Sequence, residues 1–400
     1  MKRRKVIAFL SLLPLLSILI MSEYFYRKVW RGTSHTNQGK DGFLEGHIGL
    51  RDNIQPLATG NSAGFHVISQ TQEGKTVHCP VCEKPHFADG NSNQDRDEIR
   101  FESCPPVHRT RSFETAVNPH DFKLVQNEPS LCSLPQINES ESGSVFLLIL
   151  RLTEPSNFKR RRIHRKLLET VSREQNDLVI KQVFLIGTTF NDTHTRLIQK
   201  EREQYHDVLQ EDFVDSYYNL TLKTIMGIKW ASIYCREALW VMKADDDVYI
   251  NFQHLIGYLK LMSPTKHRVI IGNKYTDKPP IRDPKNKWYV SKKVFPYAKY
   301  PPYVNGPCYV ISGCLTPWLY RESLAVPYLP MEDVFVGILA SRLEITIVHN
   351  RLFFPDRKKY HFDWFYLGIA VHLVRPTELM ANLEEYDTHL VKNKNLVQLH

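Results

Sequence analysis

The apolar run at residues 145–150 (VFLLIL) constrains the fold of this 400-residue chain more than any other feature. The run has the length of a strand and lacks polar side chains on both faces, which is typical of a parallel strand buried on both sides. Further apolar runs and helical segments alternate with it, at residues 159–168, 183–187, 193–206, 219–233 and 239–242. This alternation predicts an α/β fold with a mainly parallel sheet and helices on both faces.

Three consecutive aspartates, Asp245, Asp246 and Asp247, follow the last of these runs and precede another apolar segment at residues 248–250. Alternate side chains of an extended chain share a face, so Asp245 and Asp247 could bind one hard cation together. A solvated acidic turn is the simpler explanation for an isolated Asp-Asp-Asp. However, open α/β sheets bind ligands beyond the carboxyl ends of their strands, and this location favours a magnesium or manganese site.

The composition indicates a globular protein with a core, because 42% of the residues are hydrophobic and 24% are charged. The formal net charge of +9 is compatible with phosphate-bearing or other anionic partners. The sequence contains no helix-turn-helix, zinc-finger or RNA-binding signature, which argues against nucleic acid as a partner.

The N-terminus combines a basic cluster at residues 1–5 with an uncharged apolar run at residues 6–21. A cleaved signal peptide has the same order of charge and apolar residues, but no small-x-small pair follows the run before Glu23. We therefore predict a cytoplasmic tail (residues 1–5) and a transmembrane signal-anchor (residues 6–21), with the rest in the lumen because positive charge stays cytosolic. The polar residues 22–115 are expected to form a stem, and residues 116–400 the folded domain.

Two further patterns depend on this lumenal setting. Cys79, Cys82, His86 and Cys104 could form part of a zinc knuckle, but an oxidising lumen favours disulfides, whose pairing the spacing does not reveal. Three sequons for N-glycosylation lie at Asn138, Asn191 and Asn219. Asn219 starts a predicted helix, so a structural role is the alternative for that residue.

The second half of the chain contains three more candidate features. Gly306, in a segment of turn formers before a strand, permits the close backbone approach that a sugar or phosphate needs, although a tight turn is equally consistent. Glu332 and Asp333 follow Pro330 at a predicted helix start, where helix capping alone explains an acidic pair. His372 lies near the end of an apolar run at residues 362–374, where a buried core histidine is the usual alternative to a ligand.

The order of these motifs resembles the β-1,3-glycosyltransferase family (glycosyltransferase family 31), which includes β-1,3-galactosyltransferases and β-1,3-N-acetylglucosaminyltransferases. The resemblance covers about residues 117–380 and is strongest at residues 211–224 (EDFVDSYYNLTLKT). The other matching stretches are residues 118–120 (NPH), 127–129 (NEP), Cys132, 184–187 (FLIG), Trp230, Cys235, 243–247 (KADDD), 281–283 (IRD), 287–289 (KWY), 300–312, 332–334 (EDV) and Gly337.

The resemblance implies a GT-A-like fold with one Mn²⁺ or Mg²⁺ ion, and a type II protein of the Golgi membrane that uses a UDP-sugar donor and a glycan acceptor. It assigns metal ligation to Asp247 and Asp245, with His372 as the third ligand, and places Asp246 near the donor ribose or sugar. Asp333 would be the general base of an inverting transfer. The remaining assignments are Arg162, Arg165 and Lys223 on the nucleotide (a solvated basic face being the alternative for the arginines), Gly306 in the sugar loop, and Glu332 orienting the acceptor or capping the helix.

The chain departs from the family pattern at several positions. The family's first helix usually reads Ile-Arg-x-Thr-Trp, whereas this chain has HRKLL at residues 164–168. The family often has cysteines at the positions of Val304 and Leu339, which would fit the loss of one disulfide here. Cys308 replaces a usual glycine, and Pro307 precedes it.

Three hypotheses follow for the function. The first is β-1,3 transfer of galactose from UDP-galactose to a glycan on a glycoprotein or glycolipid, and the second is the same transfer of N-acetylglucosamine. The third, which the departures at residues 167–168 and 307–308 motivate, is a degenerate Golgi protein that binds glycans or a partner without turnover. The intact Asp245, Asp247 and Asp333 argue against the third hypothesis.

Overall fold

The computed structural model describes residues 116–134, 144–175, 177–262, 268–355 and 362–381. The predicted anchor at residues 6–21, the predicted stem at residues 22–115, Asn138, and the motif from Cys79 to Cys104 lie outside these ranges. Within the described ranges, no helix has the length and apolar composition needed to cross a membrane.

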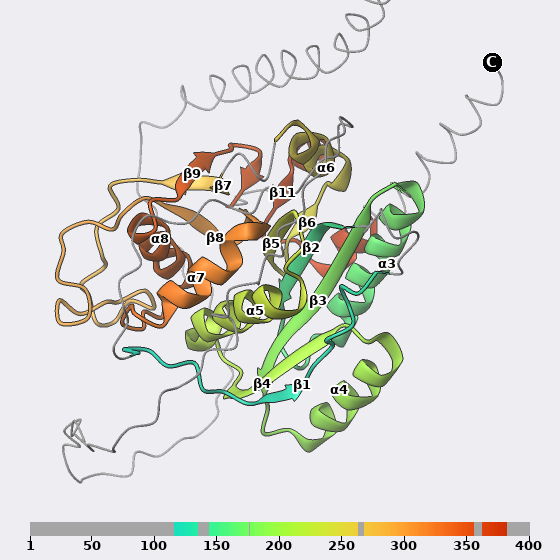
Figure 1. Ribbon diagram of the computed structural model, residues 1–400, viewed down its shortest axis with the longest axis horizontal. Helices are drawn as coiled ribbons and strands as arrows, with labels where there is room; N and C mark the ends of the chain where they lie inside the picture. Colours follow the sequence, from blue (N-terminus) through green and yellow to red (C-terminus); the bar gives the residue numbers. More distant parts are fainter. Residues whose placement is uncertain (1–115, 135–143, 176, 263–267, 356–361, 382–400) are drawn as a thin grey trace, which may run out of the picture. The chain divides into compact units, whose positions relative to one another are not determined.

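An eight-stranded sheet forms the centre of the described domain, and the predicted α/β class is confirmed (Figure 1). Its inner strands β4, β3, β2 and β5 are mutually parallel; the apolar runs predicted β2, β3 and β5, whereas β4 was not predicted. The sheet as a whole is mixed, because β8 runs antiparallel to both β5 and β7, and β1 runs antiparallel to β4. In spatial order the strands are β1 (Leu124–Gln126), β4 (Val208–Val214), β3 (Val179–Thr188), β2 (Val145–Leu152), β5 (Trp240–Asp245), β8 (Tyr303–Ser312), β7 (Val269–Tyr275) and β9 (Thr346–His349).

Strand β2 shows why the sheet is covered on both faces, since all eight of its residues are buried. Leu148 and Leu150 pack in a cluster with Met226 and Trp230 of helix α5 (Leu220–Tyr234), whereas Ile149 packs in a cluster on the opposite face. The helices α7 (Thr316–Ser323) and α8 (Glu332–Arg342) lie with α5 (Figure 1), and the opposite face is covered by α3 (Phe158–Glu174), α4 (Asp192–Tyr205) and α6 (Phe252–Leu261).

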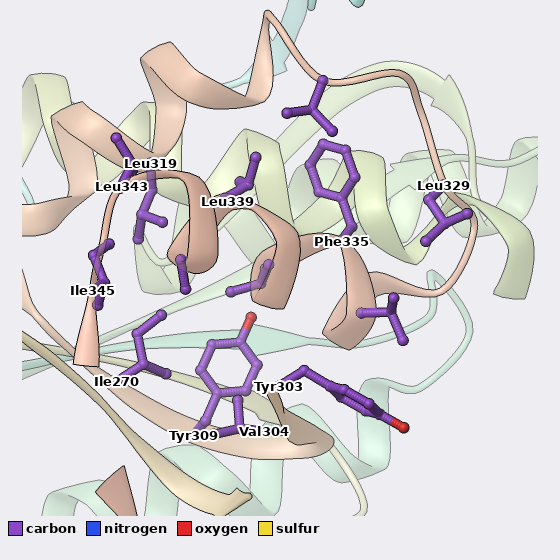
Figure 2. Close-up of a cluster of buried hydrophobic side chains, with 14 of the residues drawn as sticks. Ile270, Tyr303, Val304, Tyr309, Leu319, Leu329, Phe335, Leu339, Leu343 and Ile345 are labelled. Atoms are coloured by element: carbon purple, nitrogen blue, oxygen red, sulfur yellow. The ribbon is translucent and has the colours of Figure 1, made fainter. Parts of the chain in front are cut away.

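An extensive apolar cluster lies between β8 and helices α7 and α8 (Figure 2). Phe335 and Leu339 of α8 face Tyr309 and Val304 of β8, and all four side chains are buried. The positions where the family often has cysteines, Val304 and Leu339, thus both belong to one apolar core. This core fixes the start of α8, which carries Glu332 and Asp333, against β8.

A second, three-stranded sheet brings His372 close to the aspartates. Its strands are β10 (Phe353–Phe354), β11 (Ala370–Val371) and β6 (Tyr249–Ile250), and β6 pairs antiparallel with β11, so that Tyr249 lies opposite Val371. The residue after β11, His372, therefore returns to the start of β6, beside Asp247.

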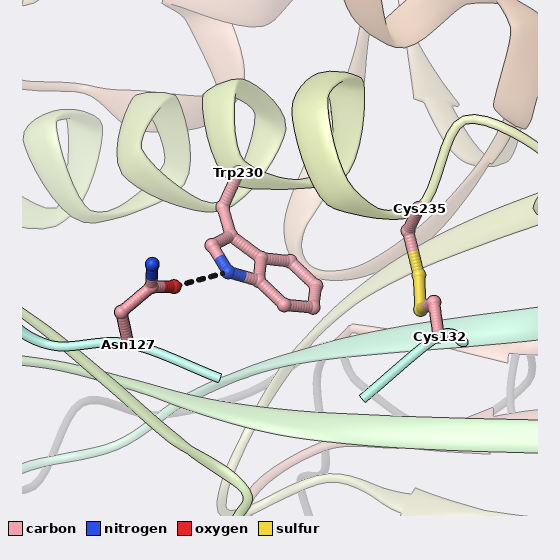
Figure 3. Close-up of a disulfide and its surroundings, with 4 residues drawn as sticks. All are labelled: Asn127, Cys132, Trp230 and Cys235. Carbon is pink, nitrogen blue, oxygen red and sulfur yellow. Dashed lines mark hydrogen bonds between the residues drawn. A yellow bond between two sulfur atoms is a disulfide. The ribbon is translucent and has the colours of Figure 1, made fainter. Parts of the chain in front are cut away.

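A disulfide joins Cys132 to Cys235 at the end of α5 (Figure 3). Near it, the indole nitrogen of Trp230 donates to Asn127 Oδ1 at 2.9 Å. These two contacts hold the segment around β1 against α5. The disulfide closes a sequence separation of 103 residues, so much of its stabilisation comes from restricting the unfolded chain.

Replacing both cysteines, in a Cys132→Ser/Cys235→Ser variant, is expected to lower the free energy of unfolding by about 2–5 kcal/mol. Chemical denaturation followed by intrinsic fluorescence measures this change. Cys308→Ala, which alters a buried cysteine that forms no disulfide, is the control and should cost less. Equal stability of the double variant and the wild type would show that the bridge contributes nothing.

Candidate active site

The three predicted metal ligands lie together at the carboxyl edge of the parallel strands. Asp245 is the last residue of β5, opposite Leu152 at the end of β2, and Asp247 follows in the turn before β6. His372 Nε2 lies 3.5 Å from Asp247 Oδ2. One ligand atom from each of Asp245, Asp247 and His372 lies within 4.8 Å of the other two, which is compatible with a single divalent ion.

The chemistry of this triad fits such an ion. His372 Nδ1 lies 2.7 Å from the carbonyl of Pro355 and can donate a hydrogen bond to it, which leaves Nε2 with a lone pair toward the two carboxylates. Although burial opposes both shifts, the contact between the two side chains holds the pKa of Asp247 below its ordinary value and raises that of His372. Two carboxylates and one imidazole form a suitable partial ligand set for Mn²⁺ or Mg²⁺.

Lys243 connects this triad to the start of α8. Its buried ammonium donates to Asp245 Oδ1 at 2.6 Å and to the carbonyl of Gly306 at 2.7 Å, and it lies 3.6 Å from Glu332 Oε2. Despite its burial, the charges of Asp245 and Glu332 raise the pKa of Lys243, which therefore stays protonated. One cation thus joins β5, β8 and α8.

Glu332 and Asp333 occupy the first turn of α8, with different surroundings. Glu332 is buried and accepts a hydrogen bond from the Tyr309 hydroxyl, and burial raises its pKa to about 7. Asp333 is partly exposed, and its Oδ1 accepts from the amide of Val334 at 2.8 Å. Burial also raises the pKa of Asp333, which makes its carboxylate a stronger base.

Gly306 lies directly beside Asp333. A Cβ atom at position 306 would be 3.5 Å from Asp333 Oδ2, so the glycine leaves the approach to this carboxylate open. Its carbonyl meanwhile accepts from Lys243. The structure thus brings together the predicted sugar-loop residue, the predicted base and, through Lys243, the metal triad.

Asp246 points away from the triad and toward the start of α3. Its Oδ2 accepts from Thr153 Oγ1 at 2.6 Å and from Asn157 Nδ2 at 2.9 Å. Its backbone carbonyl lies 2.7 Å from Nε2 of the buried His164, and burial lowers the pKa of His164 well below its ordinary value. Asp246 therefore fixes the aspartate turn against α3, and its contact with a donor remains a prediction.

Two of the three predicted nucleotide-binding cations are engaged within the chain. Arg165 makes two hydrogen bonds to Asp207, at 2.7 and 2.8 Å, and one to Glu201 at 2.6 Å. Lys223 is buried, and its ammonium donates to the Thr153 carbonyl at 2.7 Å and pairs with Asp215 at 2.8 Å. Arg162 lies exposed on α3. A nucleotide that bound Arg165 or Lys223 would have to compete with the protein groups that already contact these side chains.

Sequence reasoning missed three cations that support the aspartate turn. One is Arg160, whose Nη1 donates to the Asp246 carbonyl at 3.1 Å. Arg151, in β2, donates from Nη1 to the Asp245 carbonyl at 3.0 Å, and Lys243 has the contacts described above. Both carried a signal in the sequence. Arg151 is a buried charge immediately after a run of six apolar residues, and Lys243 lies two positions before Asp245, on the same face of the strand.

The two described sequon asparagines lie at helix starts. Asn191 is exposed and caps α4, because its Oδ1 accepts from the amide of His194 at 3.0 Å. Asn219 ends the short 3₁₀ helix η1 (Tyr217–Asn219), and its Nδ2 donates to the Val214 carbonyl at 2.8 Å. Glycosylation of either residue remains a prediction.

Comparison with known proteins identifies the family of this chain. The galactosyltransferase family model matches residues 159–351, the range that contains the three aspartates, Gly306 and Asp333. Mouse β-1,3-galactosyltransferase 1 is 34% identical over 265 residues, which cover 66% of this chain and 78% of the relative. Human β-1,3-galactosyltransferase 5 is 39% identical over 204 residues, covering 50% of this chain and 66% of the relative. The chain belongs to the β-1,3-glycosyltransferase family and is a hexosyltransferase.

Solved structures that the chain matches include other glycosyltransferases, at low similarity. The galactosyltransferase LgtC, in complex with donor and acceptor sugar analogs, has a TM-score of 0.30 and 12% identity, with 57% of this chain and 87% of LgtC covered. The bifunctional glycosyltransferase WbbM has a TM-score of 0.33 and 11% identity, with 62% of this chain and 50% of WbbM covered.

The raised pKa of Glu332 predicts a pH dependence of stability. The pKa of Glu332 rises from 4.5 in the unfolded chain to about 7 in the folded protein, so the folded state binds the proton more tightly. The stability that this proton contributes is therefore lost as the pH increases from 4.5 to about 7. Between these pH values the wild type should lose up to about 3 kcal/mol more unfolding free energy than Glu332→Gln. Denaturant unfolding measures the difference, with Glu169→Gln on the exposed face of α3 as control. Parallel pH profiles of wild type and Glu332→Gln would contradict the assignment.

Proposed function

We propose that this protein is an inverting, metal-dependent β-1,3-galactosyltransferase that transfers galactose from UDP-galactose to a glycan on a glycoprotein or glycolipid. The observation that carries the proposal is the shared contact of Lys243 with Asp245, Gly306 and Glu332, which couples a metal triad to the helix start that bears Asp333. Membership of the family supports the transfer, and the names of the relatives support galactose.

The donor half of the site would be built on Asp245, Asp247 and His372, which would hold Mn²⁺ or Mg²⁺. The bound ion supplies positive charge that offsets the negative charge of the departing UDP. Pro355 orients His372 through Nδ1, while Arg151 and Lys243 hold the end of β5, so that the two carboxylates keep their mutual geometry before any ligand binds.

The acceptor half would be built on Asp333. Its carboxylate takes the proton of the acceptor 3-hydroxyl as that oxygen forms a bond to the anomeric carbon of the donor, and the bond between this carbon and the UDP oxygen breaks. Attack on the face opposite UDP converts the α-linked donor into a β-linked product. Glu332, held by Tyr309 and Lys243, keeps the first turn of α8 in place.

We also propose that the enzyme is a single-pass type II protein of the Golgi membrane with its catalytic domain in the lumen. The basic residues 1–5 and the apolar residues 6–21 support this topology.

Replacing the proposed base, in Asp333→Asn, should lower kcat for transfer by about 10³-fold because the amide cannot accept the proton. Donor affinity, measured by calorimetry with UDP and Mn²⁺, should change little. Asp192→Asn, at an exposed acid in the first turn of α4, is the matched control. A normal rate in Asp333→Asn would show that another group takes the proton.

Removing one metal ligand, in His372→Ala or Asp247→Asn, should weaken Mn²⁺ binding by more than about 100-fold and reduce transfer in proportion, because loss of a partner of a ligand already costs about 10- to 100-fold. Calorimetric titration of Mn²⁺ in the presence of UDP reports the affinity independently of turnover. Unchanged Mn²⁺ affinity in both variants would exclude this triad as the metal site.

A screen of the common UDP-sugars, read by release of UDP, tests the donor. We expect the highest rate with UDP-galactose. A higher rate with UDP-N-acetylglucosamine would replace galactose in the proposal, and glycan binding without turnover of any donor would favour a degenerate protein.

A further inference from the structure

Four aromatic side chains form an exposed patch that no part of the proposed chemistry uses. Tyr217 and Tyr218 are 52% and 59% exposed, and Trp288 and Tyr289 are 45% and 38% exposed. We call these four residues, together with Lys287, the aromatic platform. Large aromatic rings are normally buried, and exposed clusters of them mark interaction sites.

The platform is held in place by specific contacts. Trp288 Nε1 donates to the Tyr217 hydroxyl at 3.0 Å, and the rings of Tyr217 and Tyr218 meet edge to face at 5.9 Å. The Lys287 ammonium lies 4.5 Å from the centre of the Trp288 ring and 5.6 Å from that of Tyr217. These contacts fix the rings of Tyr217, Tyr218 and Trp288 before a ligand arrives, which lowers the entropic cost of binding.

The connection between β7 and β8, which carries Trp288, is itself organised around one arginine. Arg282 donates to the carbonyl of Val290 at 2.7 Å, to that of Phe295 at 2.7 Å and to that of Tyr297 at 3.0 Å. Tyr289 also forms an isolated bridge with Ile281. The aromatic rings are therefore presented to solvent by an ordered segment.

Two series of hydrogen bonds link the segment of the platform that carries Tyr217 and Tyr218 to the proposed active site. Asp215, two residues before Tyr217, pairs with Lys223, whose ammonium also donates to the carbonyl of Thr153, and the Thr153 hydroxyl donates to Asp246. This route ties Tyr217 to the carboxyl edge of the sheet.

The second route leads to Asp333. The Tyr328 hydroxyl donates to the Tyr218 carbonyl at 2.5 Å, and Thr221 Oγ1 donates to the Leu329 carbonyl at 2.8 Å. Residues 328–330 lead directly into the first turn of α8. These hydrogen bonds link the segment that carries Tyr217 and Tyr218 to the segment that leads into Asp333.

The charge of the β7–β8 connection indicates what kind of acceptor it would attract. Residues 276–302 contain seven basic residues and two acidic ones. Lys285, Lys287, Lys292 and Lys293 are all exposed, and among the described residues none of them forms a salt bridge. A local excess of positive charge favours anionic ligands and speeds their encounter.

We propose that the aromatic platform binds the acceptor glycan, and that the lysines around it select an acceptor that carries a sulfate or carboxylate group. The apolar C–H face of a sugar ring stacks on an aromatic ring, while a neighbouring anionic group pairs with Lys287 or Lys285. The inference rests on the proposed transferase function, because it assigns the acceptor of that same site.

The test uses the full-length protein and two matched pairs of acceptors: N-acetyllactosamine with its form sulfated at galactose O6, and a p-nitrophenyl β-glucoside with the corresponding β-glucuronide. In at least one pair, kcat/KM should be about tenfold higher for the charged member at about 50 mM salt, and this preference should shrink strongly at about 500 mM salt. The two pairs distinguish sulfate from carboxylate recognition. Equal kcat/KM within both pairs would overturn the proposed charge selection.

Trp288→Ala should raise the acceptor KM by about tenfold and leave the KM for the donor unchanged, and Trp288→Tyr should restore much of the loss. Lys287→Met should remove the preference for the charged acceptor. Phe190→Ala, at an aromatic side chain that is 90% exposed elsewhere, and Lys200→Met on the exposed face of α4 are the matched controls. An acceptor KM that is unchanged in Trp288→Ala would overturn the platform assignment.

Binding measured without turnover separates this inference from the proposed function. Saturation-transfer NMR with the four acceptors, UDP and Mn²⁺ should show contacts to the sugar rings that Trp288→Ala abolishes, even if every donor proves inactive. Absence of turnover with retained glycan contacts would reject only the transferase proposal. Binding to phosphatidylserine vesicles that depends on Trp288, with no such dependence for glycans, would assign the platform to a membrane surface and overturn the inference.

Discussion

The buried ammonium of Lys243 is the interaction on which the geometry of the active site depends. It contacts one carboxylate from the metal triad, one carboxylate from the start of α8 and the carbonyl of Gly306. Without this cation, the buried Glu332 and the partly buried Asp245 would be two carboxylates with no positive charge between them, and such unpaired burial is costly. The single positive charge therefore fixes the spacing between the donor half and the acceptor half of the site.

The parts of this arrangement that depend on local patterns could be predicted from the sequence. Runs of apolar residues predicted β2, β3 and β5, and the position of Asp245 and Asp247 at a strand end followed from strand geometry. His372 was different, because only the resemblance to a family indicated it as a ligand. It reaches Asp247 through β6 and β11, two strands of two residues each, which are too short to have a readable pattern.

The parts that depend on tertiary pairing could not be predicted. Strand β8 has the apolar composition of its neighbours, but no local signal shows that it inserts antiparallel between β5 and β7. Arg165 has the residue type of a phosphate ligand, yet Glu201 and Asp207, 36 and 42 positions away, bind its guanidinium. The resemblance likewise places Asp246 near the donor, and only the tertiary structure shows that Thr153 and Asn157 hold its carboxylate.

The residues of the two proposed halves of the site differ in burial. This difference determines which of them can change without disturbing the fold. Lys243, Arg151 and Glu332 are buried in contacts with several elements, so replacing any one of them disturbs a charge network and the core at once. The residues of the β7–β8 connection that carry the exposed rings and lysines can change at small cost to stability, because they are largely solvated. The residues that we propose for metal and base chemistry are thus held by buried contacts, whereas the connection that we propose for acceptor binding can change without disturbing them.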